Sequence, residues 1–110
     1  MSEHKSARIA ALNDAFRTSF NGGRVVMTAS VNAFDPDLVN RIIEKVKSFD
    51  GFNRDNDPYG EHDFGAFEID GKKIFWKVDT YADDTFTYGA EDPTDPDCVR
   101  VLTIMLAEDY

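Results

Sequence analysis

The sequence has a single cysteine, Cys98, so no disulfide can form within the chain. Its apolar runs are far shorter than the roughly 20 successive apolar residues that a membrane-spanning helix needs. Residues 1–8 are polar and charged, and they lack the apolar segment of a secretory signal. From these three absences we expect a protein without a membrane segment that folds in the reducing cytoplasm.

Basic residues are also few: 12 Lys and Arg stand against 21 Asp and Glu, for a formal net charge of −9. Most of the imbalance lies in residues 50–97, which hold fourteen acidic and four basic residues. A groove that binds nucleic acid needs a basic surface, so the composition argues against direct nucleic-acid binding. It favours a basic protein as the partner, bound by acidic residues of this chain that imitate phosphates. The simpler interpretation is that the charge keeps a small protein soluble.

The first half of the chain predicts a helix, a strand and a second helix. Apolar residues recur at spacings of three and four over residues 6–20, and Gly22-Gly23 ends that helix. Residues 24–31 alternate between two faces, as in a half-buried strand. Asp35-Pro36 then provides an N-cap and a proline at the first helical position. The expected buried residues of the two helices are Ile9, Leu12, Phe16 and Phe20, and Leu38, Ile42, Val46 and Phe49.

The second half predicts a hairpin, a short strand and a last helix. The Asp70-Gly71 turn joins strands near 63–69 and 72–80, and Ile74, Trp76 and Val78 should point into the core. Residues 85–88 predict a short third strand. A second helix start, Asp95-Pro96, precedes an apolar run over 99–106, which we interpret as a buried helix.

These elements define an α+β fold in one small domain, residues 1–110, with the order α-β-α-β-β-β-α. The length suits one core that needs no disulfide or metal. We expect a mostly antiparallel sheet of three to four strands with about three helices packed on one face. Residues 1–5 should be frayed.

Polar chemistry is densest in residues 56–65, just before the predicted hairpin. One hypothesis is a small hydrolase-like or metal-assisted enzyme in which Glu61, His62 and Asp63 act as acid, base or ligands. In a strand, however, His62 points away from its two acidic neighbours. A calcium loop beginning at Asp55 fails because Ala66 stands where a bidentate glutamate is needed. We therefore lean away from an enzyme and expect no metal site and no cofactor.

Five strings carry a resemblance to a known family: residues 8–14, residues 56–65, Phe75-Trp76-Lys77, Asp92-Pro93 with Asp95-Pro96, and residues 100–107. In these the chain resembles the bacterial family described as domain of unknown function 3768. The resemblance implies a single-domain cytoplasmic protein encoded in proteobacterial genomes, often on plasmids or phage-like elements. It implies no established activity.

We expect a non-enzymatic binding protein, in its most specific form a mobile-element inhibitor of the anti-CRISPR or anti-restriction type. It would present an acidic surface, a DNA mimic, to a basic, nucleic-acid-binding host protein. A regulatory or toxin-antitoxin module that forms a homodimer through an exposed sheet face or edge is a further alternative. The expected partner-binding residues are Asp57, Tyr59, Glu61, His62, Asp83, Asp84, Glu91 and Asp92.

Overall fold

The computed structural model describes the backbone of residues 3–110 and the side chains of residues 5–110. Within this part of the chain, no helix combines the length and the apolar character needed to cross a membrane. The elements in chain order are α1 (Glu3–Ser19), β1 (Gly23–Met27), α2 (Ala29–Asn32), α3 (Pro36–Lys47), β2 (Phe64–Ile69), β3 (Lys72–Tyr81), β4 (Val99–Leu106) and the 3-10 turn η1 (Ala107–Asp109).

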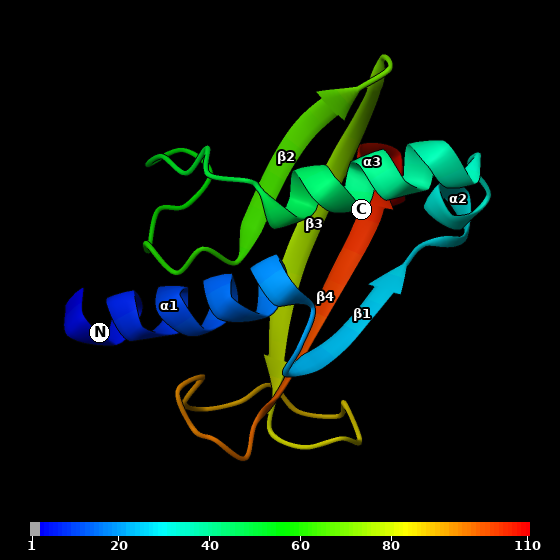
Figure 1. Cartoon of the computed structure of the whole chain (residues 1–110). Helices are drawn as coiled ribbons and strands as arrows, with labels where there is room; N and C mark the ends of the chain where they lie inside the picture. Colours follow the sequence, from blue (N-terminus) through cyan, green and yellow to red (C-terminus); the bar gives the residue numbers. More distant parts are fainter. Residues whose placement is uncertain (1–2) are drawn as a thin grey trace.

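The four strands form one sheet in the order β1-β4-β3-β2. β2, β3 and β4 pair antiparallel, whereas β1 runs parallel to β4. The helices α1 and α3 lie across the same face of this sheet (Figure 1). The structure thus confirms the α+β class, with a mostly antiparallel sheet and helices on one face.

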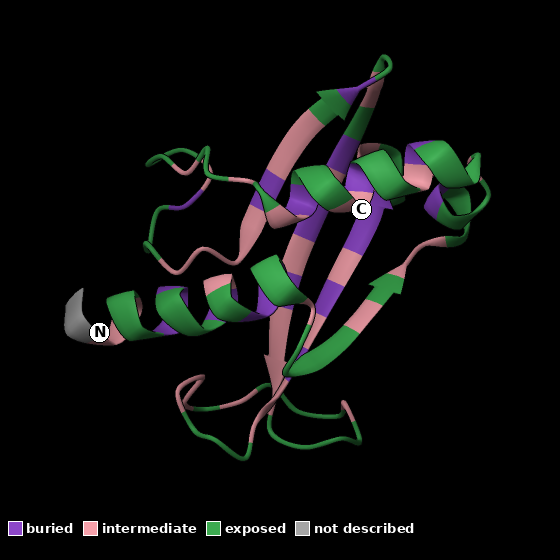
Figure 2. Ribbon diagram, viewed as in Figure 1, coloured by how far each residue is buried: buried purple, intermediate pink, exposed green. Residues whose placement is uncertain are grey.

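The core lies between that sheet face and the helices (Figure 2). The three inward residues predicted for the second hairpin strand, Ile74, Trp76 and Val78, are all buried. Trp76 lies edge-on to the rings of Phe49 and Phe52. Gly65 of β2 lies against this indole. A Cβ at this position would overlap with Trp76 Nε1, so only glycine leaves room for the ring.

Several predicted elements are confirmed. α3 begins after Asp35, whose side chain accepts a hydrogen bond from the Asp37 backbone nitrogen, and Pro36 occupies its first turn. The Asp70-Gly71 turn joins β2 to β3, and both turn residues have positive φ. The segment predicted to be frayed, residues 1–5, is helical from Glu3 onward, and its first two residues lie outside the described part.

The predicted last helix is wrong: residues 99–106 form β4, an inner strand of the sheet. A largely apolar segment of eight residues does not by itself distinguish a buried helix from an inner strand. The β-branched Val99, Val101 and Ile104 favour the strand. The Asp95-Pro96 signal starts only a turn, in which the Asp95 side chain accepts from the Asp97 backbone nitrogen.

Three smaller corrections concern element ends and faces. The strand predicted at 85–88 is absent from the described residues, where a single bridge pairs Tyr81 with Gly89. The first strand stops at Met27, and the fully buried Val31 belongs to α2. Leu12, predicted to be buried on the first helix, is 40% exposed because the polar Asn13 takes the inward position.

Candidate functional site

The candidate site lies on the α3–β2 loop, residues 48–63, which has no regular secondary structure. Its first turn is closed by Asn53, whose side-chain oxygen accepts from the backbone nitrogens of Asp55 and Asn56 at 2.8 and 3.1 Å. Gly60 and His62 both adopt left-handed backbone conformations, with φ of 66° and 54°. The chain therefore bends twice before β2 instead of running into it as an extended strand.

His62 is held on three sides by its own chain. Its Nδ1 lies 2.9 Å from Asp14 Oδ2 of α1, and its Nε2 lies 3.6 Å from Asp57 Oδ2. Phe52 stacks on the ring with a centroid distance of 3.8 Å and an interplanar angle of 1°. A general base needs a ring nitrogen directed at the substrate. Here each nitrogen faces a carboxylate of the same chain, so the ring joins the loop to α1.

Asp57 is the buried acid of this loop and closes its second turn. Its Oδ1 accepts hydrogen bonds from the backbone nitrogens of Glu61 and His62, at 3.0 and 3.1 Å. Its other oxygen faces the His62 ring. The Glu61 backbone oxygen in turn accepts from Asn13 Nδ2 at 2.9 Å. Residues 57–62 are therefore fixed to α1 through both main-chain and side-chain atoms.

Two buried polar residues of α1, Asn13 and Arg17, organise the surroundings. The Arg17 guanidinium donates to the backbone oxygens of Val46 and Lys47 at the end of α3, and to Asp14. It also lies over the Trp76 ring, 5.0 Å from the centroid. These contacts fasten α1 to α3 and fix Asp14 in place beside His62.

Asn13 makes the connection to the opposite side of α1. Its side-chain oxygen accepts from Arg100 Nε at 2.9 Å, and Arg100 is itself buried in β4. The Arg100 guanidinium also donates to the backbone oxygen of Pro93. One chain of hydrogen bonds thus runs from the α3–β2 loop through α1 to the β3–β4 loop, residues 82–98.

Four residues of this site were not predicted from the sequence: Asn13, Asp14, Arg17 and Arg100. A signal for two of them was present: Asn13 and Arg17 follow the buried Ile9 at successive spacings of four, on the inward face of the helix. A polar residue at such a position needs a partner inside the protein. The pairing of Asp14 with His62, 48 residues apart, has no signature in the sequence.

Within the described residues, no hydrogen bond joins the His62 ring to Glu61 or Asp63, the two acids grouped with it from the sequence. Partial burial raises the pKa of the Glu61 carboxyl, and the nearby charges of Asp63 and Asp57 add to the effect. Burial likewise raises the pKa of Asp63. Among the described residues, no three His, Cys, Asp or Glu side chains lie close enough together to hold a metal ion.

An open pocket of about 840 Å³ lies between the start of α1 and the second turn of the loop. Ser6 and Ala7 of α1 form one side, and residues 57–61 form the other. Tyr59 stands at this turn with 78% of its surface exposed. The site therefore brings together Asp57, Tyr59 and Glu61 of the predicted partner-binding set, with His62 behind them.

The other predicted acids lie in the β3–β4 loop, where local turns hold two of them. Asp83 accepts from the backbone nitrogen and hydroxyl of Thr85, and Asp92 accepts from the same two groups of Thr94. These hydrogen bonds lower the pKa of both carboxyls. The bond from the threonine hydroxyl has the larger effect, and the bond from the backbone nitrogen adds to it. Asp84 and Glu91 are exposed beside them.

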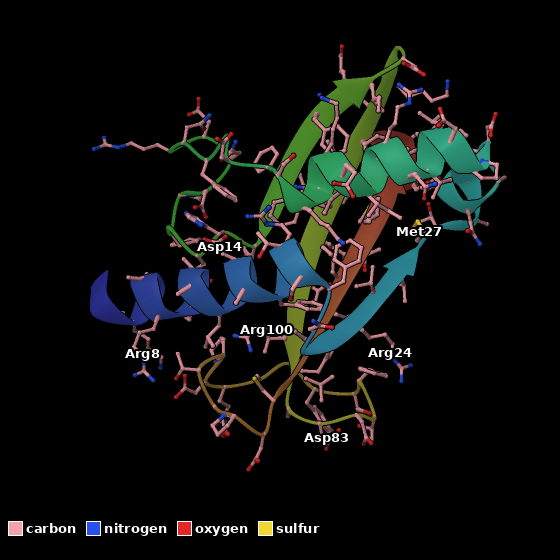
Figure 3. All side chains as sticks on the ribbon, viewed as in Figure 1. Arg8, Asp14, Arg24, Met27, Asp83 and Arg100 are labelled. Carbon is pink, nitrogen blue, oxygen red and sulfur yellow. The ribbon has the colours of Figure 1, made fainter. Side chains whose placement is uncertain are left out.

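The two acidic loops do not merge into one surface, because α1 runs between them (Figure 1). Asp14 projects from α1 toward the α3–β2 loop, and Arg8 projects toward the β3–β4 loop (Figure 3). Lys5 of α1 forms an ion pair with Asp92 at 3.5 Å. Asp83 lies at the far end of the β3–β4 loop from this contact (Figure 3). The predicted acids thus form separate groups with two basic residues between them.

The chain belongs to the family described as "Protein of unknown function (DUF3768)", whose model matches residues 27–109. This match covers α2, α3, the two loops and three of the four strands, and α1 lies outside it. No curated protein and no solved structure matches the chain significantly.

Proposed function

We propose that this chain is a non-enzymatic binding protein that uses the turn at residues 57–61 as its principal contact. The observation that supports this most is Tyr59, an aromatic residue with 78% of its surface exposed at the edge of a pocket of about 840 Å³. Aromatic residues next to pockets are frequent energetic centres of protein interfaces.

The fixed shape of this turn is what makes it suited to binding. Asp57 holds the turn through two backbone hydrogen bonds, and His62 fastens it to Asp14. A loop that is ordered before it meets its partner loses less conformational entropy on association. The contacts that hold this turn thus serve to present the exposed Tyr59 to a partner rather than to carry out catalysis.

The acidic residues indicate the chemistry of the partner. Asp83 and Asp92 have pKa values lowered by hydrogen bonds from their threonine partners, which favours the charged form of both carboxyls. Separate groups of carboxylates at such loops fit a partner whose Lys and Arg side chains are spaced to hold phosphates. We infer a basic, nucleic-acid-binding protein as partner, attracted by long-range electrostatics.

The most specific form of this proposal is an inhibitor, encoded on a mobile element, that occupies the DNA or RNA groove of a CRISPR or restriction complex. Such an inhibitor needs no active site of its own. Its affinity would come from carboxylates that meet Lys and Arg around a central aromatic contact. The net charge of −9 agrees with this form.

The test is capture of partners by the tagged protein from host lysate at low and high salt. We expect a basic nucleic-acid-binding protein to be retained by the wild type and released at high salt. Tyr59→Ala should abolish retention at low salt, where the wild type retains the partner. Asp84→Lys with Glu91→Lys should abolish it too, since both residues are exposed and neither holds a turn by a hydrogen bond.

The matched control replaces two exposed acidic residues elsewhere with lysine, Glu44 of α3 and Glu68 of β2. It therefore changes the net charge by the same amount. We expect this variant to retain the partner. Equal loss in both double variants would show that net charge alone matters, and full retention by Tyr59→Ala would refute the proposed contact.

A further inference from the structure

β1 is an edge strand with an unpaired side. Within residues 3–110 it pairs only with β4, and no other element lies beyond it in the sheet (Figure 1). Most of its residues are exposed, including Val26 at 39% (Figure 2). An edge strand that carries exposed valine is a ready template for another strand.

The opposite edge of the sheet is protected. β2 is largely covered, and its one exposed residue, Glu68, is charged. Lys45 of α3 lies over the Phe67 ring, and Arg41 pairs with Asp70 at the end of the strand. Charged residues of this kind are how natural sheets discourage pairing at an edge. Among the described residues, β1 has one charged side chain, Arg24, which lies over the Phe86 ring, whereas Val26 of the same strand is exposed, so the two edges differ.

The charge distribution points to a second copy of this chain as the occupant. Residues 18–34 contain no acidic residue, and Arg24 is their only charged residue. Elsewhere two copies with a net charge of −9 repel each other. Contact at the β1 edge therefore brings fewer acidic residues of the two copies together than contact at the acidic loops would.

The backbone of β1 defines a register for such a pair. The Thr28 backbone nitrogen donates to Ile104 of β4, and main-chain groups alternate in direction along a strand. Thus Arg24 and Val26 direct their main-chain groups toward β4, whereas Gly23, Val25 and Met27 direct theirs outward. An antiparallel pair centred on Val25 places these three outward residues opposite one another.

We propose that this chain forms a homodimer by antiparallel pairing of β1 with β1 of a second copy, centred on Val25. The pairing has two-fold symmetry, as in most homodimers, and it makes one continuous eight-stranded sheet. Arg24 of each copy faces Val26 of the other, so no like charges oppose each other. Asp109, which accepts hydrogen bonds from Thr28 and Ser30, lies near the arriving Arg24 and adds an opposite charge.

The proposal does not depend on the proposed partner, because its readout is the mass of the purified full-length chain in solution. We expect sedimentation and light scattering to show concentration-dependent dimerisation at moderate salt, where repulsion between the acidic loops is screened. A chain that is monomeric at every concentration overturns the proposal and leaves the β1 edge to an extended segment of another protein.

Charge substitutions test the register. Val26→Lys places a lysine opposite Arg24 in two symmetric pairs and should raise the dimer Kd by about tenfold or more. Adding Arg24→Glu to that variant restores opposite charges and should restore dimerisation. Val26→Asp, the size and exposure control, should dimerise at least as well as the wild type because aspartate faces Arg24.

A dimer that Val26→Lys leaves intact would place the interface elsewhere and overturn the proposal. A melting curve followed by circular dichroism distinguishes lost pairing from lost folding. Val26 is exposed in the single chain, so all three variants should retain a cooperative transition.

Discussion

The α3–β2 loop and the β3–β4 loop are both rich in acidic residues, but they are fixed in different ways. The first is held by long-range contacts: His62 to Asp14, Asn13 to Glu61, and Phe52 stacked on His62. The second is held mainly by turns within itself, in which Asp83 and Asp92 accept from threonines two residues later. The first loop therefore depends on the packing of α1, whereas much of the second would keep its turns without it.

This difference has a functional meaning. A loop fixed by distant residues keeps one shape, which suits a specific contact through an exposed aromatic such as Tyr59. Short local turns keep carboxylates ionised and accessible, which suits attraction of a basic surface at longer range. The two loops would thus divide docking and steering between them.

The largest expected effect comes from removing the residue that holds α1, and with it the first loop. Arg17→Met should lower the free energy of unfolding by about 3 kcal/mol, because it leaves Asp14 and two backbone oxygens of α3 without their buried donor. Urea unfolding measures this loss. Arg41→Met is the matched control, since Arg41 also makes two hydrogen bonds but lies exposed on α3. Equal losses in the two variants would contradict the role of the α1 contact.

The next largest effect should appear when an aspartate that holds a turn is replaced by alanine in each of the two loops. Asp57→Ala should cost about 2 kcal/mol, because it leaves two partly buried backbone N–H groups without an acceptor. Asp92→Ala also removes an acceptor of two hydrogen bonds, but its side chain is 47% exposed, against 5% for Asp57, so water can replace it. We expect a clearly smaller loss of unfolding free energy for Asp92→Ala. Hydrogen exchange should show faster opening of residues 57–62 in the first variant only.

How far the sequence predicts the fold depends on whether a pattern is local. The α3 cap at Asp35-Pro36, the Asp70-Gly71 turn and the inward Trp76 strand each depend on neighbouring residues, and all three are confirmed. The segment 99–106 was assigned wrongly because its place in the sheet, as an inner strand between β1 and β3, is a tertiary property. A helix start signal two residues from an apolar run does not overrule β-branched composition.

The candidate site was predictable only in its position. The density of polar residues over 56–65 located the loop, but it did not reveal that His62 is held by Asp14 and Asp57. Left-handed backbone at a non-glycine residue turns the ring away from the direction that strand alternation predicts. The most informative overlooked signal was polar Asn13 and Arg17 on the inward face of α1.

The smallest expected effect is a pH dependence of the unfolding free energy, which should have opposite signs for an aspartate in each of the two loops. Burial raises the pKa of Asp63, so the folded protein binds its proton more tightly than the unfolded chain does. The ionised group therefore lowers stability above the folded pKa, and this penalty disappears as the pH falls below the unfolded pKa. Asp63→Asn should accordingly raise the unfolding free energy near neutral pH, by roughly 0.5 kcal/mol at most. The gain should vanish in acid.

Asp83 behaves in the opposite way, because hydrogen bonds from Thr85 lower its pKa. Its contribution to stability is present above the unfolded pKa and is lost as the pH falls through the folded pKa. Asp83→Asn should thus lower the unfolding free energy near neutral pH, and this loss should shrink as the solution is acidified. Urea unfolding of both variants and the wild type from neutral pH to about pH 3, below the usual aspartate pKa, measures both differences. If both substitutions change the unfolding free energy near neutral pH in the same direction, the pKa shifts of the two aspartates do not have the opposite signs that their contacts imply.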